Sequence, residues 1–514
     1  MKIIDDFLNN ITMYRLMLYF LLLIFVWALF LSFIGTLPFQ PLALIFSASL
    51  IMSVCWVANR IFSFIFKAPT NLESVYITAL ILSLIITPTA DIRSLSFLFF
   101  ASVLATASKF ILSLNKKHIF NPAAVGVLIT YLTLGGAVSW WVGTAYIMPV
   151  VLIGGLLIVK KLDQWDSFFC FLAVAVPLIF IPAYLNGNDL TSLIRQIFLE
   201  SPILFFALIM LTEPLTSPPG RLYRILYGGL VGFLFTPLLH VGTFYTTPEM
   251  ALVLGNIFAF IVSPKDRLVL KLQQKNRLAP DIYDFIFEQS EKRVSLSASA
   301  RAPLIFKPGQ YLEWTLGYKD PDSRGTRRYF TIASSPTEDN LRIGVRLNDP
   351  SSSYKKALLN LNPGDEIVAG SLGGEFVLPE DKSKKLVFVA GGIGVTPYRS
   401  IVKNLIDKNE TRDIILLYSV RNVSDAVYMD VFKQAENLGV KTIITLTDAE
   451  NIPDNWSGEK GIITKEMIEK EVPDYRERIF YLSGAHGMVT SFEKTLSEMG
   501  LPKSQVKIDY FTGY

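Results

Sequence analysis

Charged residues are distributed very unevenly along this chain of 514 residues, and this restricts its fold more than any other feature. Residues 1–263 carry 23 Asp, Glu, Lys and Arg side chains, about 9% of that segment, whereas the following 251 residues carry 69, about 27%. Apolar runs long enough to cross the roughly 30 Å hydrocarbon core of a bilayer recur in the first part. The sequence therefore predicts a transmembrane domain over residues 1–264, followed by soluble domains.

The rest of the composition excludes several kinds of site. The net charge is only +4 and the basic residues form no dense patch, so we expect no nucleic-acid partner. The two cysteines, Cys55 and Cys170, lie in apolar runs and are too few for an iron–sulfur cluster or a zinc site. The chain has only three histidines, at positions 118, 240 and 486, whereas two haems with paired histidine ligands need four. We therefore expect no metal site, no iron–sulfur cluster and no haem.

Hydropathy predicts about ten helices in the membrane domain, near residues 13–35, 41–58, 74–88, 95–114, 119–135, 143–159, 167–184, 193–212, 225–240 and 248–263. The loops after every second helix hold eleven basic residues, whereas the opposite loops hold only Arg93 and Arg195. The positive-inside rule then places both termini and the soluble domains in the cytoplasm. The first helix lacks a cleavage site and is expected to be an anchor. We expect a multi-pass protein of the inner (cytoplasmic) membrane.

A weak internal repeat runs through the membrane domain. The segment ITALILSLIITP at 77–88 resembles LFFALIMLTEP at 204–214, and NPAAVGVLI at 121–129 is a fainter match to LVLGNIFAF at 252–260. These pairs predict two five-helix repeats, an arrangement that often surrounds a central site in membrane proteins. Chance similarity between apolar strings is the alternative.

Two motifs in this domain carry a resemblance. KHIFNPAAVG at 117–126 opens the fifth helix, and TEPLTSPPGR at 212–221 follows the eighth. Together with the ten-helix length, they resemble the NqrB and RnfD membrane subunits of the sodium-pumping NADH:quinone reductase and the Rnf complex, over residues 40–263. The resemblance implies an FMN attached to a threonine through a phosphoester, riboflavin in some members, and other redox subunits as partners.

The attachment motif of that family, D-x-S-G-A-T, is absent here. The nearest candidate is Thr144, in the string WVGT at 141–144 that leads into the sixth helix. Two roles stay open for it: attachment of a membrane flavin, and capping of the helix.

The soluble half divides into two patterns. Over residues 265–380, six short alternating segments separated by Gly and Pro turns predict an antiparallel β-barrel: 268–274, 281–287, 311–316, 329–334, 341–347 and 365–370. Over residues 381–514, near-continuous apolar strands alternate with helical segments. This second pattern is typical of an α/β domain whose parallel sheet has helices on both faces.

Polar residues at the end of one barrel strand point to a cofactor. In the segment 328–334, the Arg328 guanidinium can hold a diphosphate and a neighbouring hydroxyl can reach a flavin ring nitrogen. The turn at 349–354 offers backbone NH groups with Ser352 and Ser353, which suit a phosphate. An ordinary exposed strand and an ordinary serine-rich loop are the alternatives.

A glycine-rich turn follows the first strand of the parallel sheet. Gly391, Gly392 and Gly394 allow a tight turn and a close approach to a ligand. Thr396 is expected to cap the following helix, which has Pro397 in its first turn, so that the helix N-terminus faces the phosphates of a nucleotide.

These strings resemble the ferredoxin–NADP reductase superfamily over residues 265–514. Arg328, Phe330 and Thr331 match R-x-[YF]-[ST], and residues 391–397 match G-G-I-G-x-T-P. The segment 481–488 matches C-G-x-x-x-M through Gly484 and Met488, with Ser483 in place of the usual cysteine near the nicotinamide. The C-terminal segment from Asp509 resembles the F-x-G-Y ending of bacterial members, in which an aromatic ring covers the flavin. A functionless terminus is the alternative for this last match.

The resemblance implies FAD in the barrel, NADH or NADPH in the parallel-sheet domain, and hydride transfer between them. Thr331, Ser483 and Phe511 are the expected catalytic residues. The expected cofactor-binding residues are Arg328, Phe330, Thr331, Ser334, Ser352, Ser353, Gly391, Gly392, Gly394, Thr396, Pro397, Arg421, Gly484, Met488 and Tyr514. Arg421 suits a 2′-phosphate, but many NADH-dependent members also have an arginine here, so the choice of nicotinamide stays open.

A chain with both halves is expected to be a membrane-bound NAD(P)H dehydrogenase that passes electrons from FAD to a flavin or quinone in the membrane domain. Two alternatives remain: a redox-driven cation-pumping subunit of a larger Rnf- or Nqr-like complex, and an assembly subunit whose catalytic partner is another chain. Intact flavin and nucleotide motifs argue against the latter.

Overall fold

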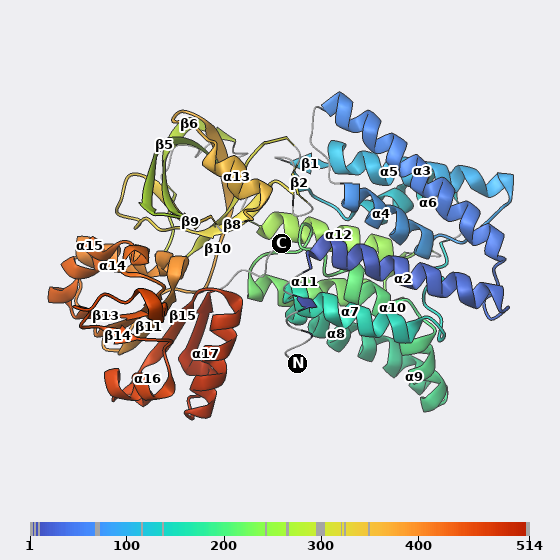
Figure 1. Ribbon diagram of the computed structural model, residues 1–514. Coiled ribbons are helices and arrows are strands. Elements are labelled where there is room, and N and C mark those ends of the chain that lie inside the picture. The colour runs from blue at the N-terminus through green and yellow to red at the C-terminus, as the bar shows by residue number, and fades with distance from the viewer. Residues whose placement is uncertain are drawn as a thin grey trace. The chain divides into compact units, whose positions relative to one another are not determined.

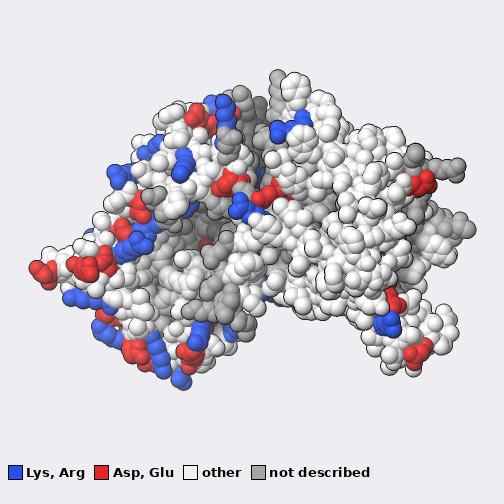
Figure 2. Space-filling model, turned by 45° about the vertical axis from the view of Figure 1, so that its right-hand side comes forward, with Lys and Arg blue, Asp and Glu red and all other residues white. Residues whose placement is uncertain are grey.

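The computed structural model describes residues 4, 7, 8, 11–66, 72–114, 117–135, 138–241, 244–263, 267–294, 304–319, 321, 322, 325–347 and 350–509, some of them by their backbone alone. The chain splits into two compact units, Met1–Ser263 and Pro264–Thr512. Lys, Arg, Asp and Glu crowd the C-terminal unit in Figure 2, whereas the visible face of the N-terminal unit is largely white.

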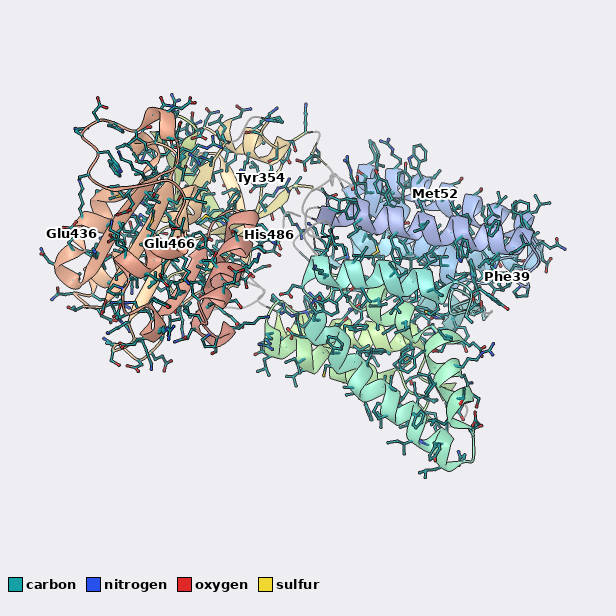
Figure 3. All side chains as sticks on the ribbon, turned by 60° about the horizontal axis from the view of Figure 1, so that its bottom comes forward. Phe39, Met52, Tyr354, Glu436, Glu466 and His486 are labelled. Atoms are coloured by element: carbon teal, nitrogen blue, oxygen red, sulfur yellow. The ribbon has the colours of Figure 1, made fainter. Side chains whose placement is uncertain are left out.

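The N-terminal unit is helical (Figure 1). Its main elements are α2 (Met13–Phe33), α3 (Pro41–Phe66), α4 (Leu72–Ile85), α5 (Ile92–Ile111), α6 (Pro122–Leu134), α7 (Met148–Leu162), α8 (Trp165–Leu185), α9 (Leu190–Leu199), α10 (Ile203–Phe205), the π-helical turn η1 (Phe206–Met210), α11 (Arg221–Leu234) and α12 (Pro248–Val262). Two short hairpins join some of them, β1–β2 (Ser113–Leu114 and Lys117–His118) and β3–β4 (His240–Val241 and Phe244–Tyr245). Many large apolar side chains lie on the outside of these helices; Figure 3 labels Phe39 and Met52 on this unit.

Described helices lie near the expected positions, but ten helices are not confirmed, because most are shorter than a bilayer requires and the eighth region is broken into several pieces. By length and composition, three described helices could cross a membrane: α2, α3 and α8. A fourth span is possible if α9 and the Ile203–Met210 segment, bent by 44° relative to each other, count as one. Among the shorter helices, Asn121 caps α6 and Thr247 caps α12, each just before a proline at the first helical position. Ten spanning helices therefore remain a prediction.

The two halves of this unit share an order of helix contacts. In the first half α3 packs against α5 and α2 against α4, and in the second α8 packs against α11 and α7 against α10 and η1. The halves meet where α6 contacts α12 and α2 contacts α7.

The C-terminal unit begins with a six-stranded antiparallel sheet in the order β8-β7-β10-β5-β6-β9. Its strands are β5 (Arg267–Ala279), β6 (Ile282–Val294), β7 (Tyr311–Thr315), β8 (Arg327–Thr331), β9 (Leu341–Arg346) and β10 (Glu366–Gly373), with α13 (Ser353–Leu359) between the last two. The two edge strands, β8 and β9, approach each other. The Ala333 NH, just after β8, donates to the Arg342 carbonyl of β9 at 2.8 Å. Buried aromatic rings, including Trp314 and Phe287, fill the interior of this barrel.

A six-stranded parallel sheet follows, in the order β14-β13-β12-β11-β15-β16. Its strands are β11 (Leu386–Gly391), β12 (Ile414–Val420), β13 (Val440–Leu446), β14 (Glu459–Lys460), β15 (Ile479–Ser483) and β16 (Val506–Asp509). Alternate residues of each strand face opposite layers: α14 (Thr396–Asp407) and α15 (Met429–Gln434) cover one face, and α16 (Lys465–Glu471) and α17 (His486–Glu498) cover the other (Figure 1).

The strand order reverses between β11 and β15. The chain proceeds from β11 outward to β14, then returns to add β15 and β16 on the other side of β11. In open parallel sheets, ligands bind at the carboxyl ends of the strands where the order reverses. This point of the C-terminal unit is the expected place for a nucleotide.

Candidate functional site

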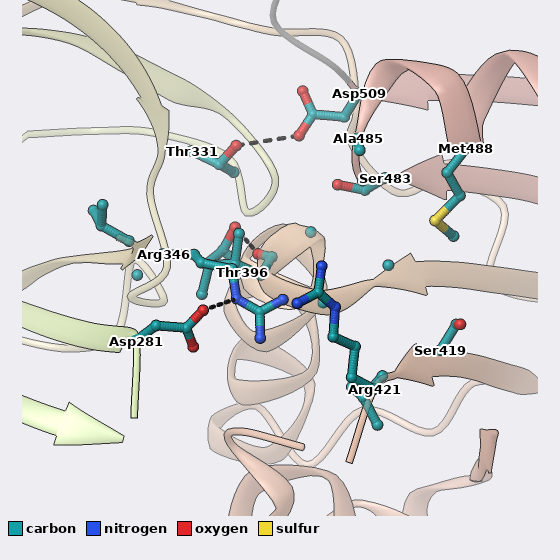
Figure 4. Close-up of a pocket in the computed structure, with 18 of the residues that line it drawn as sticks. Asp281, Thr331, Arg346, Thr396, Ser419, Arg421, Ser483, Ala485, Met488 and Asp509 are labelled. Carbon is teal, nitrogen blue, oxygen red and sulfur yellow. Dashed lines mark hydrogen bonds and ion pairs between the residues drawn. The ribbon is translucent and has the colours of Figure 1, made fainter. Parts of the chain in front are cut away.

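A cavity of about 530 Å³ lies at this point, within the C-terminal unit (Figure 4). The barrel contributes residues from β8, β9 and the β5–β6 turn. The parallel-sheet domain contributes residues at or just beyond the carboxyl ends of β11, β12, β13 and β15, together with Asp509 at the end of β16; α13 contributes Lys355. The lining residues used below are Asp281, Phe330, Thr331, Gly344, Arg346, Lys355, Gly391, Gly392, Gly394, Thr396, Ser419, Arg421, Ser483, Gly484, Met488 and Asp509. Its volume is in the range of small-molecule sites.

The glycine turn is packed too closely for larger residues. A Cβ on Gly394 would lie 2.5 Å from the Ser483 carbonyl oxygen, and one on Gly391 would lie 2.0 Å from the Met488 sulfur. Gly392 adopts a φ of +53°, in the left-handed region that favours glycine. These contacts hold the turn directly against the β15–α17 segment, which brings the two predicted motifs 391–397 and 481–488 together.

The expected capping role of Thr396 is wrong. A 3₁₀ turn over Gly392–Val395 precedes α14, so Thr396 is already the first residue of the helix. Its hydroxyl donates to the Ile393 carbonyl at 3.2 Å and lines the cavity. Pro397 is buried in the first turn of α14 and does not belong to the lining.

Thr331, Asp509 and Ser483 gather at one end of the cavity (Figure 4). The Thr331 hydroxyl donates to the Asp509 carboxylate at 3.1 Å, which joins the end of β8 to the end of β16. Burial raises the pKa of Asp509 to about 6, against the smaller lowering effect of that hydrogen bond. Asp509 was not among the predicted site residues, because its strand is too short and polar to show in the sequence.

Two arginines lie on the other side of the glycine turn (Figure 4). Arg346 forms ion pairs with Asp281 at 3.0 Å and with Asp425 at 2.8 Å, so it joins the barrel to the parallel-sheet domain. Arg421 is exposed and its side chain has no hydrogen bond or ion pair to any residue that the structure describes. Arg346 and Asp281 were missed by the sequence motifs, since neither belongs to a recognisable string.

The predicted diphosphate residues form a second cluster on the barrel. Arg328 pairs with Asp322 at 2.9 Å and lies over the Tyr354 ring at 5.1 Å from its centroid. Ser353 bonds the Tyr318 hydroxyl at 3.0 Å and accepts from the Asp322 NH at 2.9 Å, so the fold brings Arg328 and Ser353 to the same place. The neighbouring Ser352 caps α13 by accepting from the Lys355 NH at 3.3 Å.

Three other predicted residues lie elsewhere or outside the description. Ser334 is fully buried: its hydroxyl accepts from the Arg342 NH at 3.1 Å, and it does not line the cavity. Phe511 and Tyr514 lie outside the described residues.

Thr144 does not cap the sixth helix, so that alternative is wrong. The helix α7 begins at Met148, with Ile147 at its cap position and no side-chain cap. The Thr144 hydroxyl is buried without a hydrogen-bond partner among the described residues. Among all the residues that the structure describes, no group of three or more His, Cys, Asp or Glu side chains could hold a metal ion.

Comparisons with known proteins match the C-terminal unit. Residues 388–494 match the family model of the oxidoreductase NAD-binding domain. The flavohemoprotein of Bacillus subtilis is 27% identical over 210 residues, covering 40% of this chain and 51% of that protein. One component of the Na(+)-translocating NADH-quinone reductase of Pseudomonas paraeruginosa is 29% identical over 200 residues, covering 38% of this chain and 47% of that protein.

The crystal structure of the Amycolatopsis cytochrome P450 reductase GcoB aligns with 48% of this chain and 69% of its own, at 24% identity and a TM-score of 0.41. The chain spans about half the length of the curated relatives it matches. By its matches, the C-terminal unit is similar to the FAD- and NAD-binding module of ferredoxin–NADP reductases, and it follows a helical unit with three apolar helices long enough to cross a membrane.

Proposed function

We propose that this chain is a membrane-bound flavoprotein oxidoreductase that takes a hydride from NADH or NADPH onto FAD and passes the electrons to a flavin or quinone in its membrane domain. The observation that carries the proposal is the cavity at the reversal of the parallel sheet, where Thr331 of the barrel faces Ser483 and the glycine turn. The domain boundaries we propose are 1–264 for the membrane domain, 265–380 for the FAD domain and 381–514 for the nicotinamide domain.

The donors present fit both cofactors. The guanidinium of Arg328 and the hydroxyl of Ser353 suit the FAD diphosphate, and Phe330 and Thr331 extend from the same strand into the cavity. On the other side, the narrow glycine turn suits the phosphates of a nicotinamide nucleotide, as does Arg421, whose side chain has no partner among the described residues. When bound, the pair supplies a two-electron step in which NAD(P)H, FAD and a proton give NAD(P)⁺ and FADH₂.

The chain's own residues then orient the rings and manage a proton. Thr331 has one hydroxyl proton, which it donates to Asp509 at 3.1 Å in this structure. Asp509, whose pKa is raised to about 6, would donate to that hydroxyl once protonated and so leave it able to donate to a flavin ring nitrogen. Ser483 lines the cavity at the position where the ferredoxin–NADP reductase superfamily, which this unit resembles, usually has a cysteine near the nicotinamide. We assign Phe511 and Tyr514 to covering the flavin face. We assign Ser334 to supporting the segment that follows β8, and Pro397 to supporting the glycine turn. Gly484 and Met488 pack against the glycine turn.

For the N-terminal unit we propose an NqrB- or RnfD-like membrane domain of ten helices in two five-helix repeats. The shared order of helix contacts in its halves supports this, as do the apolar outer surfaces of its helices. The proposed location is the inner membrane, with both termini and the reductase module cytoplasmic. An FMN or riboflavin in this domain, a quinone, and further redox subunits are the proposed electron partners. Thr144, whose buried hydroxyl has no hydrogen-bond partner among the described residues, is the candidate for attachment.

Cofactor analysis of the full chain, purified from membranes, tests this proposal. We expect one FAD per chain, NAD(P)H oxidation with an artificial acceptor, and faster oxidation when a quinone is added. Mass spectrometry of the peptide that contains Thr144 shows whether a flavin is covalently attached. A protein that binds no FAD and oxidises neither NADH nor NADPH would contradict the reductase proposal. Haem in the purified protein would contradict the expectation that electrons travel through flavin and quinone alone.

Cation pumping is a second candidate, and one network of the N-terminal unit favours it. The Glu213 carboxylate accepts from the Asn121 side chain at 2.8 Å and bonds the His118 ring at 3.0 Å. Asn256 of α12 accepts from the Asn121 NH at 2.8 Å and donates to the Tyr227 hydroxyl at 3.3 Å. Buried polar groups of this kind in an apolar helical unit often mark ion pathways.

The two candidates differ in what happens across the membrane. Pumping predicts that NAD(P)H oxidation in proteoliposomes generates a membrane potential. It also predicts that Glu213→Gln lowers this membrane potential more than it lowers the rate of NAD(P)H oxidation. Glu200→Gln is the matched control, because Glu200 is an exposed residue paired with Arg195 at 2.7 Å. NAD(P)H oxidation that generates no membrane potential would contradict pumping and support simple dehydrogenation.

A further inference from the structure

The helix α14 is attached to the barrel one turn after it leaves the glycine turn. Arg399 is only 4% exposed, and its guanidinium donates to the Ala333 carbonyl at 2.9 Å. The same guanidinium makes a two-pronged contact with the Glu338 carboxylate, with Nη2 at 2.9 Å from Oε1 and Nη1 bonded to Oε2. A planar guanidinium held at both prongs fixes direction as well as distance.

Other bonds join the same helix to the same segment of the barrel. The Ser400 hydroxyl, fully buried, donates to the Ser334 carbonyl at 2.6 Å. At the far end of α14, the Thr337 hydroxyl donates to the Asp407 carboxylate at 2.5 Å. The segment 333–338 therefore lies along α14, and it follows Thr331 of β8 directly in the chain.

A second layer of buried polar groups surrounds this contact. Asp284, 1% exposed, pairs with Arg342 at 3.1 Å and accepts from the Tyr428 hydroxyl at 3.0 Å. The Arg399 guanidinium lies over the Tyr428 ring, 5.6 Å from its centroid. Burial raises the pKa of Glu338, but the hydrogen bonds and charge of Arg399 outweigh it and leave that pKa below its ordinary value. Glu338 is therefore held as a charged partner.

The two domains also pack closely beside this contact, with no room for a side chain at Gly344. A Cβ on Gly344 of β9 would lie 2.7 Å from Thr396 Cγ2 and 2.8 Å from the Tyr428 hydroxyl. Ordinary van der Waals contact begins near 3.4 Å. The barrel strand β9 and the start of α14 are thus in direct contact beside the cavity.

We propose that Arg399 is a positioning residue, which holds the end of β8 with Thr331 at a fixed distance from the glycine turn and so sets the spacing of the flavin and nicotinamide rings. Three residues of helix, about 4.5 Å of rise, separate Thr396 in the cavity wall from Arg399. The link between the two cofactor-binding segments is therefore short and stiff. This inference rests on the proposed hydride transfer.

The variant Arg399→Lys tests the proposal, since lysine keeps the charge but has a single nitrogen in place of the planar fork that contacts the two Glu338 oxygens through Nη1 and Nη2. Arg478→Lys is the matched control. Arg478 is 5% exposed and pairs with Asp413 at 2.7 Å and with Asp474 at 2.6 Å, all within the parallel-sheet domain and outside the cavity lining. Both variants weaken a buried arginine network, but only the network of Arg399 lies between the barrel and the parallel-sheet domain.

Two measurements on the full chain are needed. Hydrogen–deuterium exchange without nucleotide should accelerate in segments 331–335 and 391–396 of Arg399→Lys and stay unchanged there in Arg478→Lys. Single-turnover reduction of bound FAD should be about 10- to 100-fold slower in Arg399→Lys, because small misplacements of reacting groups have effects of that size. The dissociation constant for ADP-ribose, which lacks the nicotinamide, should be unchanged in both variants.

Wild-type exchange and reduction rates in Arg399→Lys, or equal losses in both variants, would overturn the proposal. If Arg399→Lys does not fold, Glu338→Gln, which keeps the shape and removes the charge, is subject to the same two criteria. A wild-type chain that binds FAD but is never reduced by NAD(P)H overturns the proposed function together with this inference. A wild-type chain that is reduced, with Arg399→Lys indistinguishable from it, overturns the inference alone.

Discussion

Asp509 has the most unusual ionisation among the residues that line the cavity. Its ordinary pKa is 3.8, and burial raises it to about 6 although Thr331 donates to it. The folded chain therefore binds a proton more tightly than the unfolded chain does. The free energy of unfolding should fall as pH rises from about 4 to about 6 and stay level above, by up to about 3 kcal/mol for this group.

Replacing this carboxyl should remove that dependence. In Asp509→Asn, the thermal midpoint should exceed that of the wild type by an amount that grows between pH 4 and pH 6 and is then constant. The rate of FAD reduction by NAD(P)H should lose an inflection near pH 6. Glu436→Gln is the control, since Glu436 is an exposed carboxyl of the same domain (Figure 3). Parallel pH profiles for the wild type and Asp509→Asn would show that Asp509 does not titrate in this range.

At the scale of elements, the turn between β11 and α14 is the most tightly packed part of the site. The predicted Gly391, Gly392 and Gly394 lie in the cavity wall, as their spacing implies, but the following helix starts differently from the expectation. A 3₁₀ turn replaces the threonine cap, because the Thr396 hydroxyl donates backward to Ile393. A sequence string identifies such a turn more easily than the exact residue at which the helix begins.

Gly394→Ala should therefore damage the site. Its new methyl group would meet backbone atoms of Ser483 and Gly484 at 2.5–2.7 Å, and overpacking of this kind typically costs about 1–3 kcal/mol. We expect a lower thermal midpoint and weaker NAD(P)H binding, measured by titration of the bound flavin's absorbance. Gly487→Ala is the control, since a Cβ there meets nothing within 4 Å. Equal behaviour of the two variants would contradict the packing argument.

Strands of the parallel sheet differ in how well the sequence predicts them. The cores of β11, β12, β13 and β15 are apolar runs and were expected. β14 has only two residues, Glu459 and Lys460, and β16 reads Val-Lys-Ile-Asp, so neither shows a buried-strand pattern. Both lie at the edges of the sheet, where one side needs no apolar cover. Asp509 escaped prediction for this reason.

Over the whole molecule, the buried apolar clusters do not mix the two units. One cluster contains only described residues up to Ala259, and the other three contain only described residues from Leu268 onward. The change in charge density at Pro264 lies close to the point where these described cores separate. It could not predict the contacts of Arg346 with Asp281 and Asp425, or of Arg399 with Glu338, because these partners are far apart in sequence and only the fold brings them together.

Separate cores predict separate folding. A fragment of residues 264–514 should be soluble, bind FAD and reduce an artificial acceptor with NAD(P)H at a rate within about tenfold of the full chain, since its hydrophobic clusters are complete. Quinone-dependent oxidation should be lost, because it needs the membrane domain. Absorbance spectroscopy and steady-state assays on both proteins check this. An insoluble or flavin-free fragment would indicate that the C-terminal unit depends on the helices for folding.

The attachment of α14 to the barrel also divides the nicotinamide domain into a fixed part and an exchangeable part. Arg399 and Ser400 tie the glycine turn to the barrel, and Asp425 and Tyr428 tie the segment after β12 to it through Arg346 and Asp284, whereas Thr447 lines the cavity just after β13. The loop after β13 could therefore be exchanged with little effect on this attachment. An exchange of the segment after β12, made to favour NADH or NADPH, would have to keep Asp425 and Tyr428 for the alignment of the two domains to be inherited unchanged.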